Sequence, residues 1–134
     1  MNDFRLSQRS VSRLNGVHPD LVKITKLALK KSKYDFGISE GVRTQALQDY
    51  YVSKGRSTTR HGLHLIQKDG YSHAIDFYVL DERGKVTWKI GYYRKVMQAF
   101  VHAAIELGYP IDLGGLWQSF VDGPHVQLSK KYRV

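Results

Sequence analysis

The chain has 134 residues, of which 42% are hydrophobic and 25% charged, and its formal net charge is +9. This length and composition indicate one globular domain over residues 1–134, without the run of about 18 apolar residues that a membrane span needs. Because the chain has no cysteine, disulfides, thiolate metal sites and cysteine nucleophiles are excluded.

Two helices and a short strand are predicted in the first half of the chain. Pro19 stands at the expected first turn of one helix, and Asp20 complements the helix dipole there. Apolar residues follow at helical spacing, at Leu21, Ile24, Leu27 and Ala28. A short strand is expected within residues 36–42, and Thr44 is expected to cap a second helix that Gly55 ends. The predicted inward face of this second helix comprises Leu47, Tyr50 and Tyr51.

The second half of the chain predicts an antiparallel sheet interrupted by one long helix. The clearest strand is residues 74–80, where apolar and polar side chains alternate. Residues 81–84 indicate a hairpin turn, residues 92–107 a helix ended by glycine, and residues 111–113 and 125–128 short strands. Helices followed by such strands favour an α+β fold, a small antiparallel sheet with helices packed on one face.

Two polar residues of the predicted strands are candidates for a metal site. Asp76 lies on the face opposite Ile75, and His125 lies on the face opposite Val126. If both apolar faces cover the core, Asp76 and His125 converge on the open face, where a histidine of the preceding loop could join them. Two histidines and one carboxylate leave a fourth position for water, as catalytic zinc requires. Alternatively, Asp76 is a solvated strand residue and His125 a surface histidine.

A further carboxylate, Asp122, stands three residues before His125. At that position it could serve as a general base without binding the metal. It could equally be an ordinary turn residue, because Asp-Gly is a common turn pair.

In this order, several segments of the chain resemble one known family. They are SEGVRTQ at 39–45, the loop through His64 into HAID at 73–76, GGLW at 114–117 and DGPH at 122–125. These segments are similar to the zinc peptidases of bacterial cell-wall peptides. That family includes the D-alanyl-D-alanine carboxypeptidases and the L-alanyl-D-glutamate peptidases that phages use as endolysins. Residues 6–22 are similar to the opening of the phage endolysin branch.

The resemblance implies a role for each matching residue. Asp76 and His125 match two ligands of a Zn²⁺ ion, Asp122 matches the catalytic carboxylate, and Arg43 matches an arginine that binds a substrate carboxylate. The first ligand is expected to be His64.

His61 is the substitute for His64, because the spacing departs from the family pattern. His64 stands twelve residues before Asp76, so residues 65–72 look like an inserted loop whose role the sequence leaves open. His73 is expected to be structural or to lie beside the site. Leu116 occupies a position where relatives often carry aspartate.

The activity that the resemblance implies is zinc-dependent hydrolysis of the peptidoglycan stem peptide between L-alanine and D-glutamate. One alternative is a D-alanyl-D-alanine carboxypeptidase with the same chemistry. A more distant alternative is a non-catalytic module that uses the positive charge to bind cell wall or nucleic acid. No nucleic-acid fold signature accompanies the charge, so no specific nucleic-acid partner is expected.

The expected route to the substrate follows from the first residues, which contain no apolar signal core. We therefore expect a monomer that accumulates in the cytoplasm of the host cell. Such a protein would need a membrane-permeabilising partner of the holin type to reach the cell wall.

Overall fold

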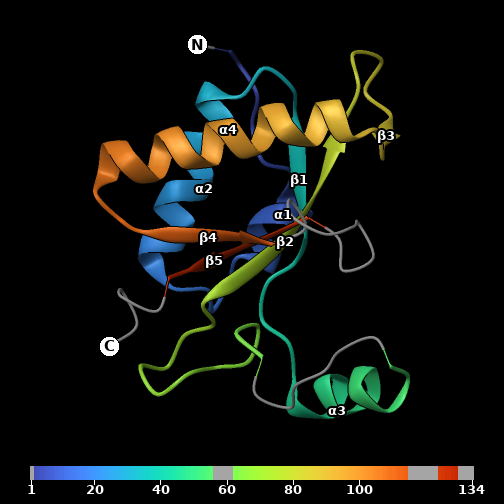
Figure 1. Cartoon of the computed structure of the whole chain (residues 1–134), viewed down its shortest axis with the longest axis vertical. Helices are drawn as coiled ribbons and strands as arrows, with labels where there is room; N and C mark the ends of the chain where they lie inside the picture. The colour runs from blue at the N-terminus through green and yellow to red at the C-terminus, as the bar shows by residue number, and fades with distance from the viewer. Residues whose placement is uncertain (1, 56–61, 115–123, 130–134) are drawn as a thin grey trace.

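The computed structural model describes residues 2–55, 62–114 and 124–129 (Figure 1). The predicted α+β fold is confirmed, because helices cover one face of an open antiparallel sheet. In chain order the elements are α1 (Gln8–Arg13), α2 (Pro19–Lys31), β1 (Phe36–Glu40), α3 (Gln45–Ser53), β2 (Ala74–Leu80), β3 (Val86–Thr87), α4 (Ile90–Leu107), β4 (Ile111–Gly114) and β5 (His125–Leu128).

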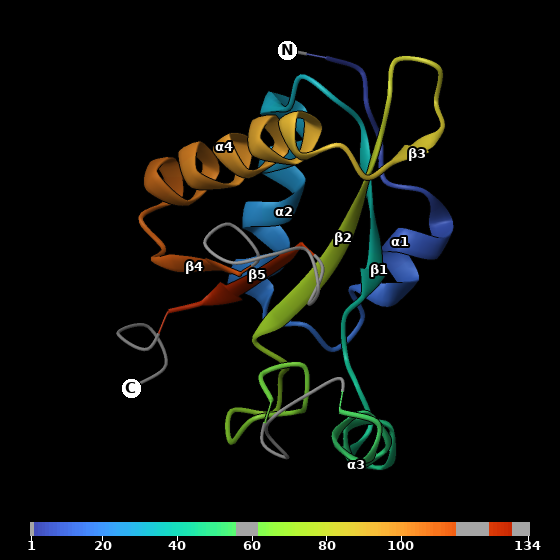
Figure 2. The same cartoon turned by 45° about the vertical axis from the view of Figure 1, so that its right-hand side comes forward.

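The sheet has the strand order β1-β2-β5-β4, and the short β3 pairs with β2 off this path (Figure 2). All of these pairings are antiparallel, and β5 pairs with β2 in the register Ile75 with Val126 and Asp76 with His125. Alternate residues of β2 are buried, whereas Asp76 and Tyr78 between them are half-buried. The predicted alternation of the 74–80 strand is therefore confirmed.

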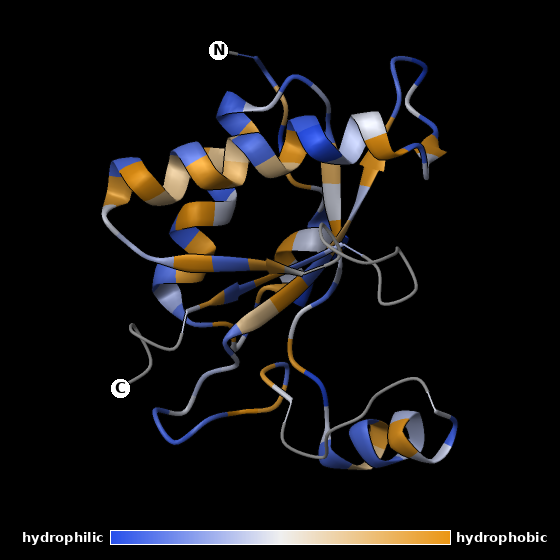
Figure 3. Ribbon diagram, viewed as in Figure 1, coloured by the Kyte–Doolittle hydropathy of each residue, from blue (hydrophilic) through white to orange (hydrophobic). Residues whose placement is uncertain are grey.

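Helices α2 and α4 pack against each other over the apolar face of the sheet. Their core includes the fully buried Leu21, Ile24 and Phe100, and the ring of Phe100 lies 5.3 Å from that of Phe77 on β2. In Figure 3 the hydrophobic residues gather on these helices and on the strands, and the turn between β2 and β3 is hydrophilic. Within the described residues, no helix has the length and apolar character of a membrane span.

The helix ends follow the capping signals in the sequence. Pro19 is the first residue of α2, Thr44 Oγ1 accepts the Leu47 N–H at 3.1 Å, and Gly108 closes α4 with a φ of 77°. A left-handed residue after a helix is the usual place for glycine, which has no Cβ to clash. The loop signals therefore set the boundaries of α2, α3 and α4.

The predicted inward face of α3 is wrong. Leu47 is 36% exposed and Tyr50 49% exposed, while the buried residue of α3 is Gln48. The physical reason is the position of this helix, because α3 lies at the opposite end of the molecule from α4 in both views (Figures 1 and 2). Away from the apolar core, α3 turns a polar side chain inward to meet Arg43.

Candidate active site

Three of the predicted site residues meet on the open face of the sheet. Asp76 on β2 lies directly opposite His125 on β5, with Asp76 Oδ1 2.9 Å from His125 Nδ1. His64, from the segment before β2, places its Nε2 3.1 Å from the same oxygen. One ligand atom of each residue lies within 4.8 Å of the others. His64 and His125, which lie twelve and forty-nine positions from Asp76 in the sequence, thus converge on its carboxylate.

The outward nitrogens of the two histidines show what this group can bind. His64 Nδ1 lies 2.8 Å from the backbone oxygen of Gly41, and His125 Nε2 lies 2.8 Å from Gln127 Oε1. Both partners are oxygens that only accept, so each neutral ring donates its outward N–H and turns an unprotonated nitrogen toward Asp76. The lone pairs of the two inward nitrogens then face the Asp76 carboxylate, and a cation placed among the three groups would bind them all.

This donor set fits a divalent metal ion that takes nitrogen and oxygen ligands and keeps an open coordination position. The hydrogen bonds of His64 to Gly41 and of His125 to Gln127 are the outer contacts that usually orient metal-binding histidines.

The carboxylate of Asp76 is charged at neutral pH, as metal ligation requires. Burial by itself raises the pKa of this carboxyl, but its contacts with His125 and His64, where a proton or a cation can lie between ring nitrogen and carboxylate, outweigh burial and hold the pKa well below its ordinary value.

Arg43 lies at the edge of this group, and other side chains fix its guanidinium. Its Nε donates to Glu40 Oε1 at 2.5 Å, its Nη1 donates to Gln48 Oε1 at 2.7 Å, and its Nη2 lies 3.8 Å from Asp76 Oδ2. The guanidinium also lies over the Tyr51 ring, 4.8 Å from its centre. Arg43 thus presents a fixed positive charge beside Asp76, and its role toward a substrate carboxylate stays a prediction.

Two residues around Arg43, Glu40 and Gln48, were not predicted from the sequence. Gln48 is 1% exposed and accepts from Arg43 although it belongs to a helix that stands apart from the core. A Cβ built on Gly62 would lie 3.1 Å from Gln48 Nε2, so Gly62 lets the chain pass close to this side chain. The available signal was the Thr44 cap, which places Gln48 one turn into α3 beside Arg43.

Three other sequence predictions concern residues outside the described part of the chain. These are Asp122 as the catalytic carboxylate, His61 as the substitute ligand, and Leu116 at the position of a frequent aspartate. They stay predictions. His64, the preferred first ligand, occupies the position that the metal-site hypothesis requires.

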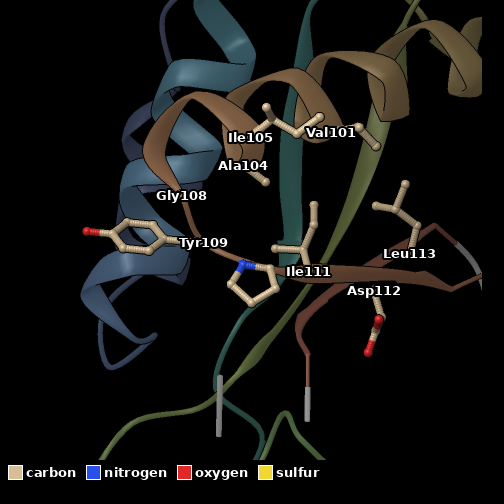
Figure 4. Close-up of a pocket in the computed structure, with 9 residues that line it drawn as sticks. Val101, Ala104, Ile105, Gly108, Tyr109, Ile111, Asp112 and Leu113 are labelled. Carbon is tan, nitrogen blue, oxygen red and sulfur yellow. The ribbon is translucent and has the colours of Figure 1, made fainter. Parts of the chain in front are cut away.

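A pocket of about 560 Å³ lies elsewhere, between the end of α4 and β4 (Figure 4). Its lining is mostly apolar, and the side chain of its carboxylate, Asp112, points away from α4 (Figure 4). None of His64, Asp76 and His125 lines this pocket. The chemistry therefore belongs to the open face of the sheet and not to this hollow.

Comparisons with known proteins agree on one family. A family model described as phage L-alanyl-D-glutamate peptidase matches residues 2–129. The L-alanyl-D-glutamate peptidase of Escherichia phage T5 is 31% identical over 139 residues, which cover 93% of this chain and 98% of that protein. The L-alanyl-D-glutamate peptidase of Listeria phage A118 is 37% identical over 95 residues, 70% of this chain and 30% of that protein.

A solved structure is also similar. The crystal structure of the Serratia marcescens L-Ala D-Glu endopeptidase ChiX has a TM-score of 0.83 and 38% sequence identity to this chain. The similarity covers 96% of this chain and 93% of that one.

Proposed function

Since the chain belongs to the family of phage L-alanyl-D-glutamate peptidases, we propose that its activity depends on a zinc ion held by His64, Asp76 and His125. The activity itself is hydrolysis of the peptidoglycan stem peptide between L-alanine and D-glutamate. One observation carries the metal proposal: both histidines commit their outward nitrogen to an oxygen and turn the other toward Asp76.

Zinc suits these ligands, because it accepts imidazole and carboxylate together and leaves a coordination position open in catalytic sites. When bound, it would polarise the scissile carbonyl and make the attacking water more acidic. The chain's own contribution is to keep Asp76 ionised and to hold both rings in the required tautomer.

Asp122 is proposed as the general base and then the general acid. It would accept a proton from the attacking water and deliver that proton to the leaving amine. The support is its place in the sequence, three residues before His125. Pro124, between them, is held at the sheet by a hydrogen bond from the Phe77 N–H to its oxygen, at 3.2 Å.

Arg43 is proposed to bind a carboxylate of the substrate. Glu40 and Gln48 hold its guanidinium in place beside Asp76, so a substrate carboxylate would meet a charge that is already oriented. Orientation of this kind is the contribution that positioning residues make to catalysis.

The first test is digestion of purified peptidoglycan with and without a chelator, followed by mass spectrometry of the released peptides. We expect new amino termini at D-glutamate, which the chelator abolishes and added zinc restores. Loss of terminal D-alanine instead would assign the chain to the carboxypeptidase alternative. Full cleavage in the presence of the chelator would contradict the metal proposal.

A second test concerns the proton transfer. Asp122→Asn should abolish cleavage and leave zinc binding intact, because the residue is proposed to act beside the metal and not on it. Full hydrolytic activity in this variant would exclude Asp122 as the base.

We also propose how the enzyme reaches its substrate. A phage peptidase made inside the host would act as a monomer on the cell wall only after a holin-type protein has permeabilised the membrane. Lysis of host cells that express the chain without any permeabilising protein would contradict this route.

A further inference from the structure

A second group of two histidines and a carboxylate lies outside the site described above. His73, directly before β2, places its Nε2 2.6 Å from Asp69 Oδ2, and His18, directly before α2, places its Nε2 3.7 Å from the same oxygen. The rings of His18 and His73 meet edge to face, with 5.3 Å between their centres. Asp69 belongs to the 65–72 loop, so this group joins the loop to two other parts of the chain.

The remaining ring nitrogens show that protons, and not a metal, hold this group together. His18 Nδ1 accepts the Asp20 N–H at 3.1 Å, so the proton of the neutral ring is on Nε2, toward Asp69. A metal on His73 Nε2 would move that ring's proton to Nδ1, which is buried and has no hydrogen-bond partner among the described residues. These contacts are the reverse of those at His64 and His125, where both outward nitrogens donate to oxygens.

The backbone of His73 connects the three segments that carry the proposed metal ligands. Its N–H donates to the oxygen of Leu63, the residue before His64, at 2.8 Å. Its own oxygen accepts the N–H of Leu128 on β5, the strand of His125, at 3.0 Å. Asp76 follows three residues later on β2. A shift of His73 would therefore move His64, Asp76 and His125 relative to one another.

We propose that the contact between Asp69 and His73, supported by His18, positions His64 for metal binding. This inference rests on the proposed role of His64 as a ligand. His64 is fixed on one side by the segment that follows β1, because its oxygen accepts the Arg43 N–H at 2.8 Å and its Nδ1 donates to Gly41. The Asp69–His73 contact supplies the support on the other side, where the chain enters and leaves the 65–72 loop.

The loop itself is built to hold Asp69 in this place. Asp69 Oδ1 accepts the Tyr71 N–H at 3.1 Å, which fixes the carboxylate above the turn. The Gln67 side chain donates to the oxygens of Gly62 and Leu65, at 3.2 and 2.7 Å. The Gln67 N–H donates to the Tyr71 oxygen at 2.9 Å and so joins the two sides of the loop. Ser72 donates its N–H to Gly16 and accepts that of His18, both at 2.9 Å.

The carboxylate of Asp69 is stabilised in its charged form by these contacts. Its partial desolvation raises the pKa, but the hydrogen bonds from His73 and from the Tyr71 N–H outweigh that effect and lower the pKa of Asp69. Asp69 is therefore ionised at neutral pH and holds His73 by a charge-assisted hydrogen bond, which is stronger than a neutral one.

The test is the zinc affinity of Asp69→Asn, measured by competition with a chromogenic chelator, together with the absorption spectrum of the cobalt-substituted protein. We expect roughly 10-fold weaker zinc binding, at the low end of the 10- to 100-fold effect of outer partners, and an altered cobalt spectrum. In the metal-free variant, hydrogen exchange at the His73 amide should be faster. Glu106→Gln on α4 makes the same change in net charge and should leave all three measurements unchanged.

A second pair of variants tests the inference if Asp69→Asn folds poorly. His73→Gln keeps a donor near the position of Nε2 and should retain most of the zinc affinity, whereas His73→Leu should lose it to the same extent as Asp69→Asn.

The outcomes are distinguishable. Unchanged zinc affinity and an unchanged cobalt spectrum in Asp69→Asn would overturn the positioning role, with the proposed function intact. Two zinc ions per chain, falling to one in Asp69→Asn, would overturn it by making the second group a metal site. No zinc binding by the unaltered chain would overturn the proposed metal site and this inference with it.

Discussion

The group of His64, Asp76 and His125 differs from the group of His18, Asp69 and His73 in which ring nitrogen of each histidine carries the proton. At His64 and His125 the outward nitrogens donate to Gly41 and Gln127, and the inward nitrogens are free for a cation. At His18 the outward nitrogen accepts a backbone N–H, and the inward one carries the proton. Both groups combine two histidines and one aspartate whose ligand atoms lie within 4.8 Å of one another. The hydrogen bond on the far side of each ring therefore separates a metal site from a hydrogen-bonded one.

The first prediction separates the two candidates for the first ligand. His64→Gln should weaken zinc binding by more than about 100-fold, beyond the range of outer-contact losses, because it removes a ligand. His61→Gln should bind zinc as the unaltered chain does. Zinc titration of both variants makes the comparison, and loss of zinc binding in His61→Gln would reverse the assignment.

The second prediction concerns Arg43. Arg43→Lys keeps the charge but loses the planar fork that Glu40 and Gln48 hold. We expect kcat/KM on stem peptide to fall about 10- to 100-fold, which corresponds to the roughly 1.5–3 kcal/mol of a charged hydrogen bond. Arg94→Lys on the exposed face of α4 is the matched control. Equal kcat/KM in both variants would show that the fork is not needed.

At the level of helices and strands, the regular pattern of the sequence predicted much of the fold. The strands at 74–80 and 125–128 are confirmed residue by residue, because one buried face imposes a period of two on their side chains. Helix α1 was not predicted. It has six residues, one of them fully buried, and it is held by contacts from afar, such as Arg13 Nη1 donating to the Ile38 oxygen at 2.8 Å.

The candidate site was predictable only in part, for a related reason. Asp76 and His125 lie on regular strands, so their faces followed from the alternation. His64 lies in irregular chain, and only the resemblance pointed to it. Glu40 and Gln48 serve Arg43 through the tertiary arrangement of β1 and α3, which no local periodicity encodes.

The third prediction concerns the end of β1. A Cβ on Gly41 would lie 1.9 Å from the backbone oxygen of Arg13, and the Gly41 oxygen also accepts from His64. Gly41→Ala should therefore lower the free energy of unfolding by about 1–3 kcal/mol, as overpacking does, and weaken zinc binding as well. Urea unfolding and zinc titration measure the two effects.

The control for Gly41→Ala is Gly91→Ala in the first turn of α4, where a Cβ would meet no heavy atom within 4 Å. This change should be neutral or stabilising by up to about 1 kcal/mol, because alanine favours the helix. Equal stability of the two variants would exclude the predicted clash at Gly41.

At the scale of the whole molecule, the metal site joins segments that are distant in the chain, so zinc should stabilise the entire fold. At a free zinc concentration 100 times the Kd, the native state gains about 2.7 kcal/mol. We expect this gain to raise Tm by roughly 5–10 °C in a chain of this size. Calorimetry with and without zinc tests it, and an equal rise in His64→Gln would place the bound zinc elsewhere.

The last prediction concerns the net charge of +9. Lys23, Lys26 and Lys30 lie exposed on α2, in the layer that covers the sheet face opposite Asp76. Changing all three to glutamine should weaken binding to anionic envelope polymers and make that binding less sensitive to salt. Cleavage of a short, soluble stem peptide should be unchanged, because the lysines are far from the reacting face. Slower cleavage of that peptide would contradict this separation.

The pairing of Asp76 with His125 across β2 and β5 also makes the metal a reporter of correct assembly. A slip of one residue between these strands would turn either Asp76 or His125 to the opposite face of the sheet. Molecules refolded in a shifted register would then bind no zinc at this site, although their secondary structure would look the same by circular dichroism. The zinc content of a refolded preparation therefore counts the molecules whose strands have aligned correctly.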